Sequence, residues 1–213
     1  MNIVFLGPPG AGKGTMAERV ADETGLAHVS TGDIFRDNIR HETELGRKVK
    51  ELIDHGNLVP DSITIELVQD RLQEADVQLG WILDGFPRTR PQAEALSDFA
   101  RVDLVIHLDL SDEEVIRRLS GRRVHPASGR TYHIEYSPPK KDGFDDETGE
   151  PLIKRDDDEE ESIRQRLSVY MSQTEPVISY YREKRLIVDV DATGSIDAVA
   201  AKIHNVLEKH AAG

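Results

Sequence analysis

Ile3-Val4-Phe5-Leu6-Gly7-Pro8-Pro9-Gly10-Ala11-Gly12-Lys13-Gly14-Thr15 is the stretch of sequence that decides the fold. It begins with a short apolar run, as in a buried strand, and continues as a glycine-rich loop that ends in a lysine and a threonine. Glycine lets the backbone turn its N–H groups inward, where side chains would block a polyphosphate. The stretch therefore predicts a phosphate-binding loop.

A helix is expected directly after this loop, with Met16, Ala17 and Val20 on one face. Its N-terminus would point at the phosphates and add partial positive charge, while Lys13 supplies a full one. The loop departs from the generic motif because Gly14 follows the lysine and the hydroxyl comes one residue later. A glycine-rich turn without function is the alternative for this stretch taken alone.

Composition narrows the class of protein. A chain of 213 residues is long enough for one domain with insertions and a substantial core. The net charge of −13 argues against nucleic acid or an anionic membrane surface as a partner. The chain has no cysteine, which excludes disulfides and cysteine-bound zinc. No apolar run approaches the length of a bilayer span, so we expect a soluble, unprocessed, cytoplasmic protein.

Short apolar segments alternate with helical patterns along the chain. This alternation predicts an α/β fold in which a five-stranded parallel sheet lies between two helical layers, the three-layer α/β/α arrangement of P-loop proteins. The strands are expected at residues 3–6, 26–29, 81–84, 104–108 and 186–188. Asp61 is expected to cap the helix after residue 60, and Pro176 to kink a later one.

Two segments interrupt the alternation. Residues 37–56 are charged and helical with few large apolar side chains, and the region around 121–158 is rich in Pro, Gly and Asp and too long for a bare loop. We predict a helical insertion at 30–59 and a small β insertion at 121–158, both set on a core formed by residues 1–29, 60–120 and 159–213.

Charged residues stand at the ends of the predicted elements. Asp84 closes a buried strand, where it is placed to hold Mg²⁺ through water; an ordinary helix cap or surface acid is the alternative. Cations lie beside strand ends and insertion boundaries at Lys13, Arg36, Arg88, Arg118, Arg122, Arg155 and Arg166. The acidic run 156–161 is interpreted as a solvated helix start. Phosphoryl transfer needs alignment and positive charge, so these cations are expected to converge on phosphate.

Four motifs then carry a family resemblance: Gly-Pro-Pro-Gly-Ala-Gly-Lys-Gly-Thr at 7–15, Ser-Thr-Gly-Asp at 30–33, Asp-Gly-Phe-Pro-Arg at 84–88 and Gly-Arg-Arg at 121–123. In this order they resemble the adenylate kinases of the bacterial long-lid type, over essentially the whole chain. The resemblance implies reversible transfer, ATP + AMP = 2 ADP, with Mg²⁺ and a role in purine nucleotide homeostasis. It also implies a monomer whose insertions are a monophosphate-binding domain and a lid.

The same resemblance implies the site residues. ATP would be bound by Gly10, Ala11, Gly12, Lys13, Gly14, Thr15, Arg118, Arg122, Thr131, Tyr132 and the backbone near Gly194. AMP would be bound by Thr31, Arg36, Asn57, Leu58, Val59, Gly85, Phe86, Pro87, Arg88 and Gln92. Arg155 and Arg166 would bridge the transferring phosphate, and the catalytic set would be Lys13, Arg88, Arg122, Arg155 and Arg166.

The residues themselves support one base contact. The primary amide of Gln92 can both donate to and accept from the adenine edge, although a polar residue in the first turn of a helix is the alternative. His107, alone in an apolar strand, is expected to be buried and satisfied rather than catalytic.

Many members of this family carry four zinc-binding cysteines in the lid. Here the matching positions are His125, Ser128, Asp145 and Thr148, a set suited to a hydrogen-bond network rather than to a thiolate zinc site. We therefore predict no structural metal.

Two other functions remain as alternatives. A nucleotide-dependent switch is weaker, because the chain has no Asn-Lys-x-Asp sequence and has more arginines than sensing one nucleotide requires. A UMP or CMP kinase is disfavoured by the long lid and by Gln92. The expected mechanism has no covalent intermediate: the insertions close, water leaves, and the AMP phosphate attacks the γ-phosphorus in line.

Overall fold

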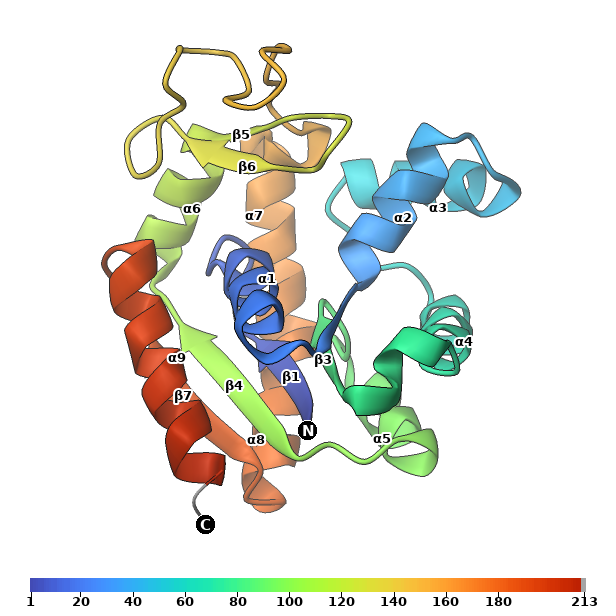
Figure 1. Cartoon of the computed structure of the whole chain (residues 1–213). Helices are drawn as coiled ribbons and strands as arrows, with labels where there is room; N and C mark the ends of the chain where they lie inside the picture. The colour runs from blue at the N-terminus through green and yellow to red at the C-terminus, as the bar shows by residue number, and fades with distance from the viewer. Residues whose placement is uncertain (212–213) are drawn as a thin grey trace.

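The sheet is the centre of the molecule. A computed structural model describes residues 1–211, and its main sheet has the strand order β2-β3-β1-β4-β7 with every pair parallel (Figure 1). The strands are β1 (Asn2–Leu6), β2 (Ala27–Ser30), β3 (Trp81–Asp84), β4 (Leu104–Asp109) and β7 (Ile187–Asp191). The predicted fold class and five strands are therefore confirmed.

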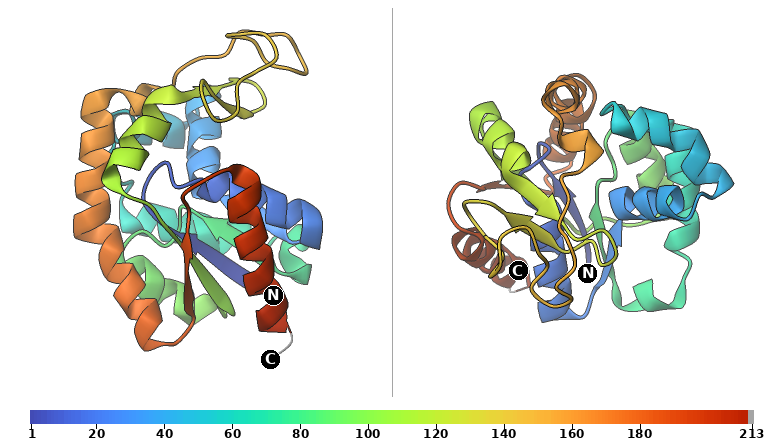
Figure 2. Two further views of the ribbon diagram at one scale, coloured as in Figure 1. Left: turned by 90° about the vertical axis from the view of Figure 1, so that its left-hand side faces the viewer. Right: turned by 90° about the horizontal axis from the view of Figure 1, so that it is seen from above.

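Helices cover both faces of this sheet (Figure 2). Ile3 and Phe5 of β1 pack with one set, while Val4 and Leu6 pack with the other, since successive strand residues point to opposite faces. The first face is covered by α1 (Lys13–Thr24), α6 (Asp112–Gly121), α7 (Glu160–Val169) and α9 (Ile196–Ala211); the second is covered by α4 (Asp61–Arg71), α5 (Arg90–Phe99) and α8 (Glu175–Glu183). The strands β1, β3 and β4 are buried on both faces over most of their length, which explains their nearly continuous apolar runs, whereas the edge strand β7 includes exposed residues.

The helical insertion consists of α2 (Thr31–Arg40) and α3 (Glu44–Asp54). Its own small core is formed by Phe35, Val49 and Val59, separate from the two clusters on the sheet. The two helices approach so closely that a Cβ on Gly46 would lie 2.1 Å from the carbonyl oxygen of Asn38. All three buried residues of this cluster lie within residues 30–59, and Ile63 and Leu67 of α4 pack against it.

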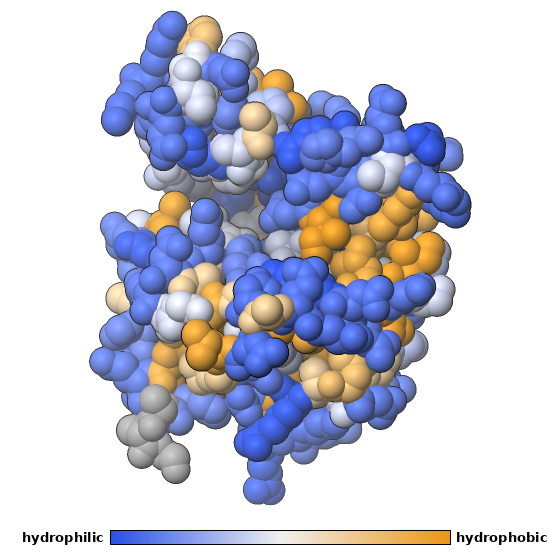
Figure 3. Space-filling model, turned by 45° about the vertical axis from the view of Figure 1, so that its right-hand side comes forward, coloured by the Kyte–Doolittle hydropathy of each residue, from blue (hydrophilic) through white to orange (hydrophobic). Residues whose placement is uncertain are grey.

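The second insertion has little regular structure. Strands β5 (Arg122–Val124) and β6 (Thr131–His133) form an antiparallel pair, and Val124 also pairs with Ile153 near the end of the segment. It lies above the carboxyl ends of the main strands (Figure 1). A space-filling view shows a recessed band between this mostly hydrophilic segment and the body below it (Figure 3).

One local expectation was wrong: Pro60, not Asp61, occupies the cap position of α4, and the carboxylate of Asp61 is used elsewhere. Near Pro176, where a kink was expected, a π-helical turn, η3 (Tyr170–Thr174), separates α7 from α8. Short 3₁₀ turns lie at η1 (Ala75–Leu79) and η2 (Asp156–Asp158). Within residues 1–211 no helix is both long and apolar enough to cross a bilayer.

Candidate active site

The glycine-rich loop joins β1 to α1. Gly12 precedes α1 in a left-handed conformation with φ of 89°, and no side chain caps the helix. The first N–H groups of α1 are thus left without a side-chain acceptor, which suits an anion. The Nζ of Lys13 folds back over the loop and donates to the carbonyl oxygens of Gly7 and Pro8, both at 2.9 Å.

The electrostatic surroundings of Lys13 favour an anion. Burial lowers the pKa of its amino group to about 8; Asp84 opposes this shift, while Arg88, Arg166 and Arg122 add to it. These three arginines therefore act on the same point as the lysine, although they come from distant parts of the sequence. A bound polyphosphate would offset the repulsion between them.

Asp84 lies against the phosphate loop. A Cβ built on Gly14 would come within 3.2 Å of its Oδ2, which is closer than most side-chain contacts. A larger residue at position 14 would therefore have to displace the Asp84 carboxylate by a few tenths of an ångström. A carboxylate beside the loop, with the Thr15 hydroxyl in the first turn of α1, is a donor set that fits Mg²⁺ held partly through water.

A buried carboxylate organises two of the predicted arginines. Asp158 is 1 % exposed and accepts two hydrogen bonds from Arg122, from Nε at 2.7 Å and Nη2 at 2.5 Å. Arg166 Nη1 lies 3.3 Å from the same carboxylate and 2.9 Å from Asp157 Oδ2. The interpretation of the acidic run as a solvated helix start was therefore wrong at these two aspartates, which hold arginines in place.

The remaining cations stand near this group. Burial, then Arg36 and Arg122, lower the pKa of Arg155 to about 9. Burial also lowers the pKa of Arg166 to about 10, against the attraction of Asp157. Both side chains remain protonated at neutral pH, so positive charge is concentrated beside the phosphate loop.

A pocket lies next to this cluster, between the helical insertion and the end of β3. It is lined by predicted monophosphate-binding residues together with others: Thr31, Gly32, Phe35, Arg36, Ile53, Gly56, Asn57, Leu58, Val59, Thr64, Gly85, Arg88, Gln92, Asp157 and Arg166. The predicted Phe86 and Pro87 are buried and joined by a cis peptide bond. They are not among the residues that line the pocket.

Gly85 makes a close approach at the floor of this pocket. Its φ is +81°, and a Cβ there would lie 2.8 Å from Thr31 Oγ1 and 2.9 Å from Arg88 Nη2. The guanidinium of Arg88 is anchored over it, since Nε donates to the Gly85 carbonyl oxygen at 2.7 Å. Only glycine leaves room for this arrangement.

The amide of Gln92 is 2 % exposed and already has two partners. Nε2 donates to Asp61 Oδ1 at 2.7 Å, and Oε1 accepts from the Arg88 N–H at 2.7 Å. A primary amide has two donor hydrogens and two acceptor lone pairs, so one of each remains for a ligand.

Of the residues predicted to bind ATP, Arg118 and Gly194, assigned to the base, lie near each other, whereas Thr131 and Tyr132 belong to the second insertion. Arg118 Nη2 donates to the Ala192 carbonyl oxygen at 2.8 Å, close to Gly194, which has φ of +98°. Thr131 is exposed on β6. The Tyr132 hydroxyl is engaged within the lid, where it donates to Asp145 and accepts from the Asp146 N–H, both at 2.9 Å. The Tyr132 hydroxyl is thus occupied by protein groups.

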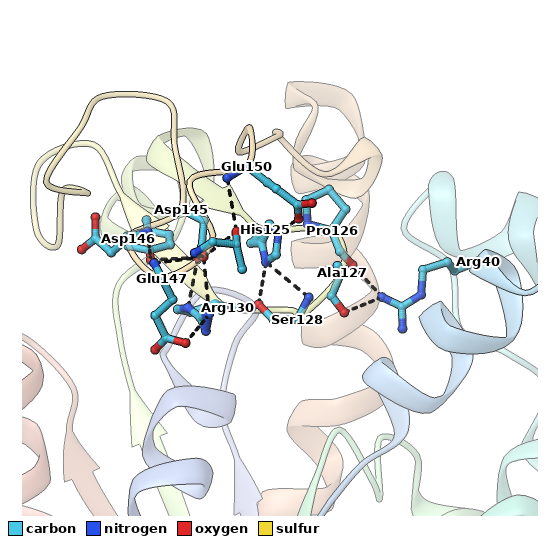
Figure 4. A network of polar contacts seen from close by, with 12 residues as sticks. Arg40, His125, Pro126, Ala127, Ser128, Arg130, Asp145, Asp146, Glu147 and Glu150 are labelled. Carbon is cyan, nitrogen blue, oxygen red and sulfur yellow. Dashed lines mark hydrogen bonds and ion pairs between the residues drawn. The ribbon is translucent and has the colours of Figure 1, made fainter.

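The four positions predicted to form a polar network are joined by hydrogen bonds, and Figure 4 labels His125, Ser128 and Asp145 among them. His125 Nδ1 is 2.8 Å from Ser128 Oγ, and Thr148 Oγ1 donates to Asp145 Oδ2 at 3.0 Å and lies 3.4 Å from His125 Nε2. Burial alone would raise the pKa of Asp145, but hydrogen bonds from Thr148, Tyr132 and the Glu147 backbone lower it to about 2.

Sequence reasoning missed two members of this network. Glu150 Oε2 is 2.7 Å from His125 Nε2, and Arg130 Nε donates to Asp145 at 3.0 Å. Both residues are charged and partly exposed, so nothing in the sequence pattern distinguished them from ordinary surface residues. Among residues 1–211 there is no group of three or more His, Asp or Glu side chains arranged to hold a metal ion.

Arg40 was also missed. It lies at the end of α2, outside every motif, and its Nη1 donates to the carbonyl oxygens of Pro126 and Ala127 at 2.6 and 3.0 Å (Figure 4). The helical insertion therefore touches the lid beside the His125 network. His107 is buried in β4 and lies 2.7 Å from Asp189, as expected for a satisfied core histidine.

The cation cluster, formed by Lys13, Arg88, Arg122 and Arg166, joins a loop suited to a triphosphate to a pocket that is lined in part by Arg36, Arg88 and Arg166. A fold of this kind with charge placed between two such sites defines a P-loop kinase that moves a phosphoryl group between nucleotides. The family model described as adenylate kinase matches residues 5–186. The chain belongs to the adenylate kinase family.

Full-length relatives agree with this assignment. The chain is 48% identical to an adenylate kinase of Finegoldia magna over 98% of this chain and 100% of the relative. It is 50% identical to one of Methanothrix thermoacetophila, over 98% and 99%, and 52% identical to one of Treponema denticola, over 94% and 96%.

Proposed function

We propose that the cation cluster between the phosphate loop and the adjoining pocket carries the reaction of this adenylate kinase, ATP + AMP = 2 ADP. ATP would bind with its phosphates on the loop, and AMP would bind in the pocket lined by Thr31, Arg36 and Gln92. The observation that supports this most directly is that Arg88 and Arg166 line the pocket, while the buried carboxylate of Asp158 contacts both Arg166 and Arg122. Positive charge at this point neutralises a phosphoryl group in transit.

The residues would act by positioning and charge, without a covalent intermediate. The AMP phosphate attacks the γ-phosphorus in line, and the bond to the ADP leaving group breaks as the new bond forms. Arg88, held by Gly85, and Arg166, held by Asp157, would bind the transferring group and the AMP phosphate. Arg122, fixed by Asp158, and Arg155 would complete the charge.

Adenylate kinases use Mg²⁺ with ATP, and bound Mg²⁺ supplies charge neutralisation on the phosphate oxygens. We propose that Asp84 would hold the ion through water, since its carboxylate lies against the loop at Gly14. The His125, Ser128, Asp145 and Thr148 network would stabilise the lid in place of a structural metal.

We propose that residues 30–59 and 121–158 are the two parts that close over the nucleotides. The separate core of the first and the contact of Arg40 with Pro126 and Ala127 of the second support this division. Closure would exclude water, so that ATP is not hydrolysed. We also propose that the chain acts as a monomer in the cytoplasm.

A coupled assay with MgATP and AMP tests the residue assignment. Purified protein should form two ADP for each ATP and AMP consumed, and alanine variants of Arg88, Arg122 and Arg166 should each lose turnover. Competition between AMP, UMP and CMP would show which monophosphate the pocket takes. Slow hydrolysis of ATP without ADP formation from AMP would instead identify a nucleotide-dependent switch.

A further inference from the structure

Asp61 does not line the monophosphate pocket, yet it contacts the residue assigned to the AMP base. Oδ1 accepts from Gln92 Nε2 at 2.7 Å and Oδ2 accepts from Thr89 Oγ1 at 3.0 Å. Thr89 in turn caps α5, because its Oγ1 accepts from the Gln92 N–H at 3.3 Å. One carboxylate therefore holds both the start of α5 and the amide of its third residue.

The chemistry of the two partners decides which way round that amide lies. A carboxylate oxygen can only accept a hydrogen bond, so Asp61 must face the NH₂ group of Gln92. The backbone N–H of Arg88 can only donate, so it must face the amide oxygen, which it does at 2.7 Å. Rotating the amide by half a turn would oppose oxygen to oxygen and N–H to N–H, losing both bonds.

We propose that Asp61 is a positioning residue that sets base specificity by locking the orientation of the Gln92 amide. This inference rests on the proposed contact between Gln92 and the AMP base. In the locked orientation, the remaining N–H of Gln92 Nε2 and the remaining lone pair of Oε1 each have a fixed position. Adenine presents an acceptor at N1 beside a donor amino group at C6, and the locked order fits that edge.

A base with the donor and acceptor groups exchanged should bind poorly to the locked amide. Hypoxanthine, the base of IMP, has a donor at N1 and an acceptor oxygen at C6. An amide rotated by half a turn would bind it as well as the locked amide binds adenine. A buried site built for one donor and acceptor order discriminates strongly, because the wrong base leaves polar groups unpaired.

The position of Asp61 in the chain links this lock to the pocket. It is the first residue of α4 and follows Pro60, which comes directly after the pocket-lining segment Asn57–Val59. The carboxylate thus joins the chain that leaves the helical insertion to the start of α5. The lock is made by protein groups alone, so the fold itself sets the orientation of the amide.

The test is Asp61→Asn, which keeps the shape but can face Gln92 with either an oxygen or an NH₂ group. We measure kcat/KM for AMP and for IMP at saturating MgATP. The kcat/KM for IMP divided by that for AMP should rise by about tenfold, which is the change expected from the loss of one hydrogen bond to a charged partner. The change should appear in KM rather than kcat, because the arginines at the phosphate are untouched.

Matched variants make the outcome decisive. Asp70→Asn removes a charge from an exposed position on the same helix and should leave the ratio unchanged. Asp61→Ser, whose hydroxyl can donate or accept, replaces Asp61→Asn if the latter folds poorly. A ratio that stays constant in the Asp61 variants but changes in Gln92→Ala overturns the lock. A ratio that stays constant in Gln92→Ala as well overturns the proposed base contact itself, and the lock with it.

Discussion

Replacing Arg88 by alanine should lower phosphoryl transfer by two to three powers of ten. The Arg88 side chain lines the monophosphate pocket, and its Nε is bound to the Gly85 carbonyl oxygen. Within residues 1–211 its two terminal nitrogens donate to no protein group, so both are available to phosphate oxygens. Two charge-assisted hydrogen bonds of about 1.5–2 kcal/mol each amount to about 3–4 kcal/mol, or roughly 10²–10³ in rate.

The loss should not come from unfolding. Burial lowers the pKa of Arg88, and Arg36 adds to the shift although Asp84 opposes it, so the variant removes a cation from crowded surroundings. We therefore expect an unchanged or slightly higher melting temperature. ATP affinity, measured by calorimetry, should change only a few-fold, because the loop and Lys13 are intact.

The assay is ADP formation coupled to NADH oxidation, with Arg90→Ala as the matched control. Arg90 lies two residues further on, is exposed, and pairs with Glu94 at 2.8 Å. The control should retain near-normal turnover. Less than about a tenfold fall in kcat/KM for Arg88→Ala would refute the assignment of Arg88 to the transferring phosphate.

Three further predictions follow from the geometry. Because the pKa of Lys13 is lowered to about 8, kcat/KM for MgATP should fall above pH 8. At saturating MgATP, kcat should persist to higher pH, since bound phosphates raise the pKa of Lys13. A kcat/KM that stays constant from pH 7 to 10 would contradict this prediction. Deprotonation of Lys13 favours the folded state, so the melting temperature should not fall with activity through this group. Arg40→Ala should raise KM for both nucleotides a few-fold and leave kcat equal or higher, because exposed contacts contribute about 1 kcal/mol or less. The control is Arg47→Ala in the same insertion. Equal changes of KM in the two variants would show that the Arg40 contact has no role. Zinc measured by mass spectrometry should be below stoichiometry in protein that remains fully active, and one bound zinc per chain would disprove a metal-free lid.

Local patterns were enough to predict the phosphate loop, the five strands and the family. Each depends on neighbours in the chain: alternating or continuous apolar residues set the strands, and Gly10 and Gly12 adopt positive φ at the loop. The two insertions could be recognised for the same reason, since their composition differs from that of the core. These properties belong to short segments and can be recognised before the chain folds.

The tertiary structure decided which charged groups meet. Asp158 and Asp61 carry no local mark that separates them from surface acids, yet one holds Arg122 and the other orients Gln92. Arg40 reaches a lid backbone 86 residues away in sequence. Hydrogen bonds form only within about 3 Å, so these contacts depend on how segments distant in sequence pack together. Composition and periodicity therefore do not predict them. The sequence by itself determined the kind of enzyme, and the folded chain determined how its charges are held.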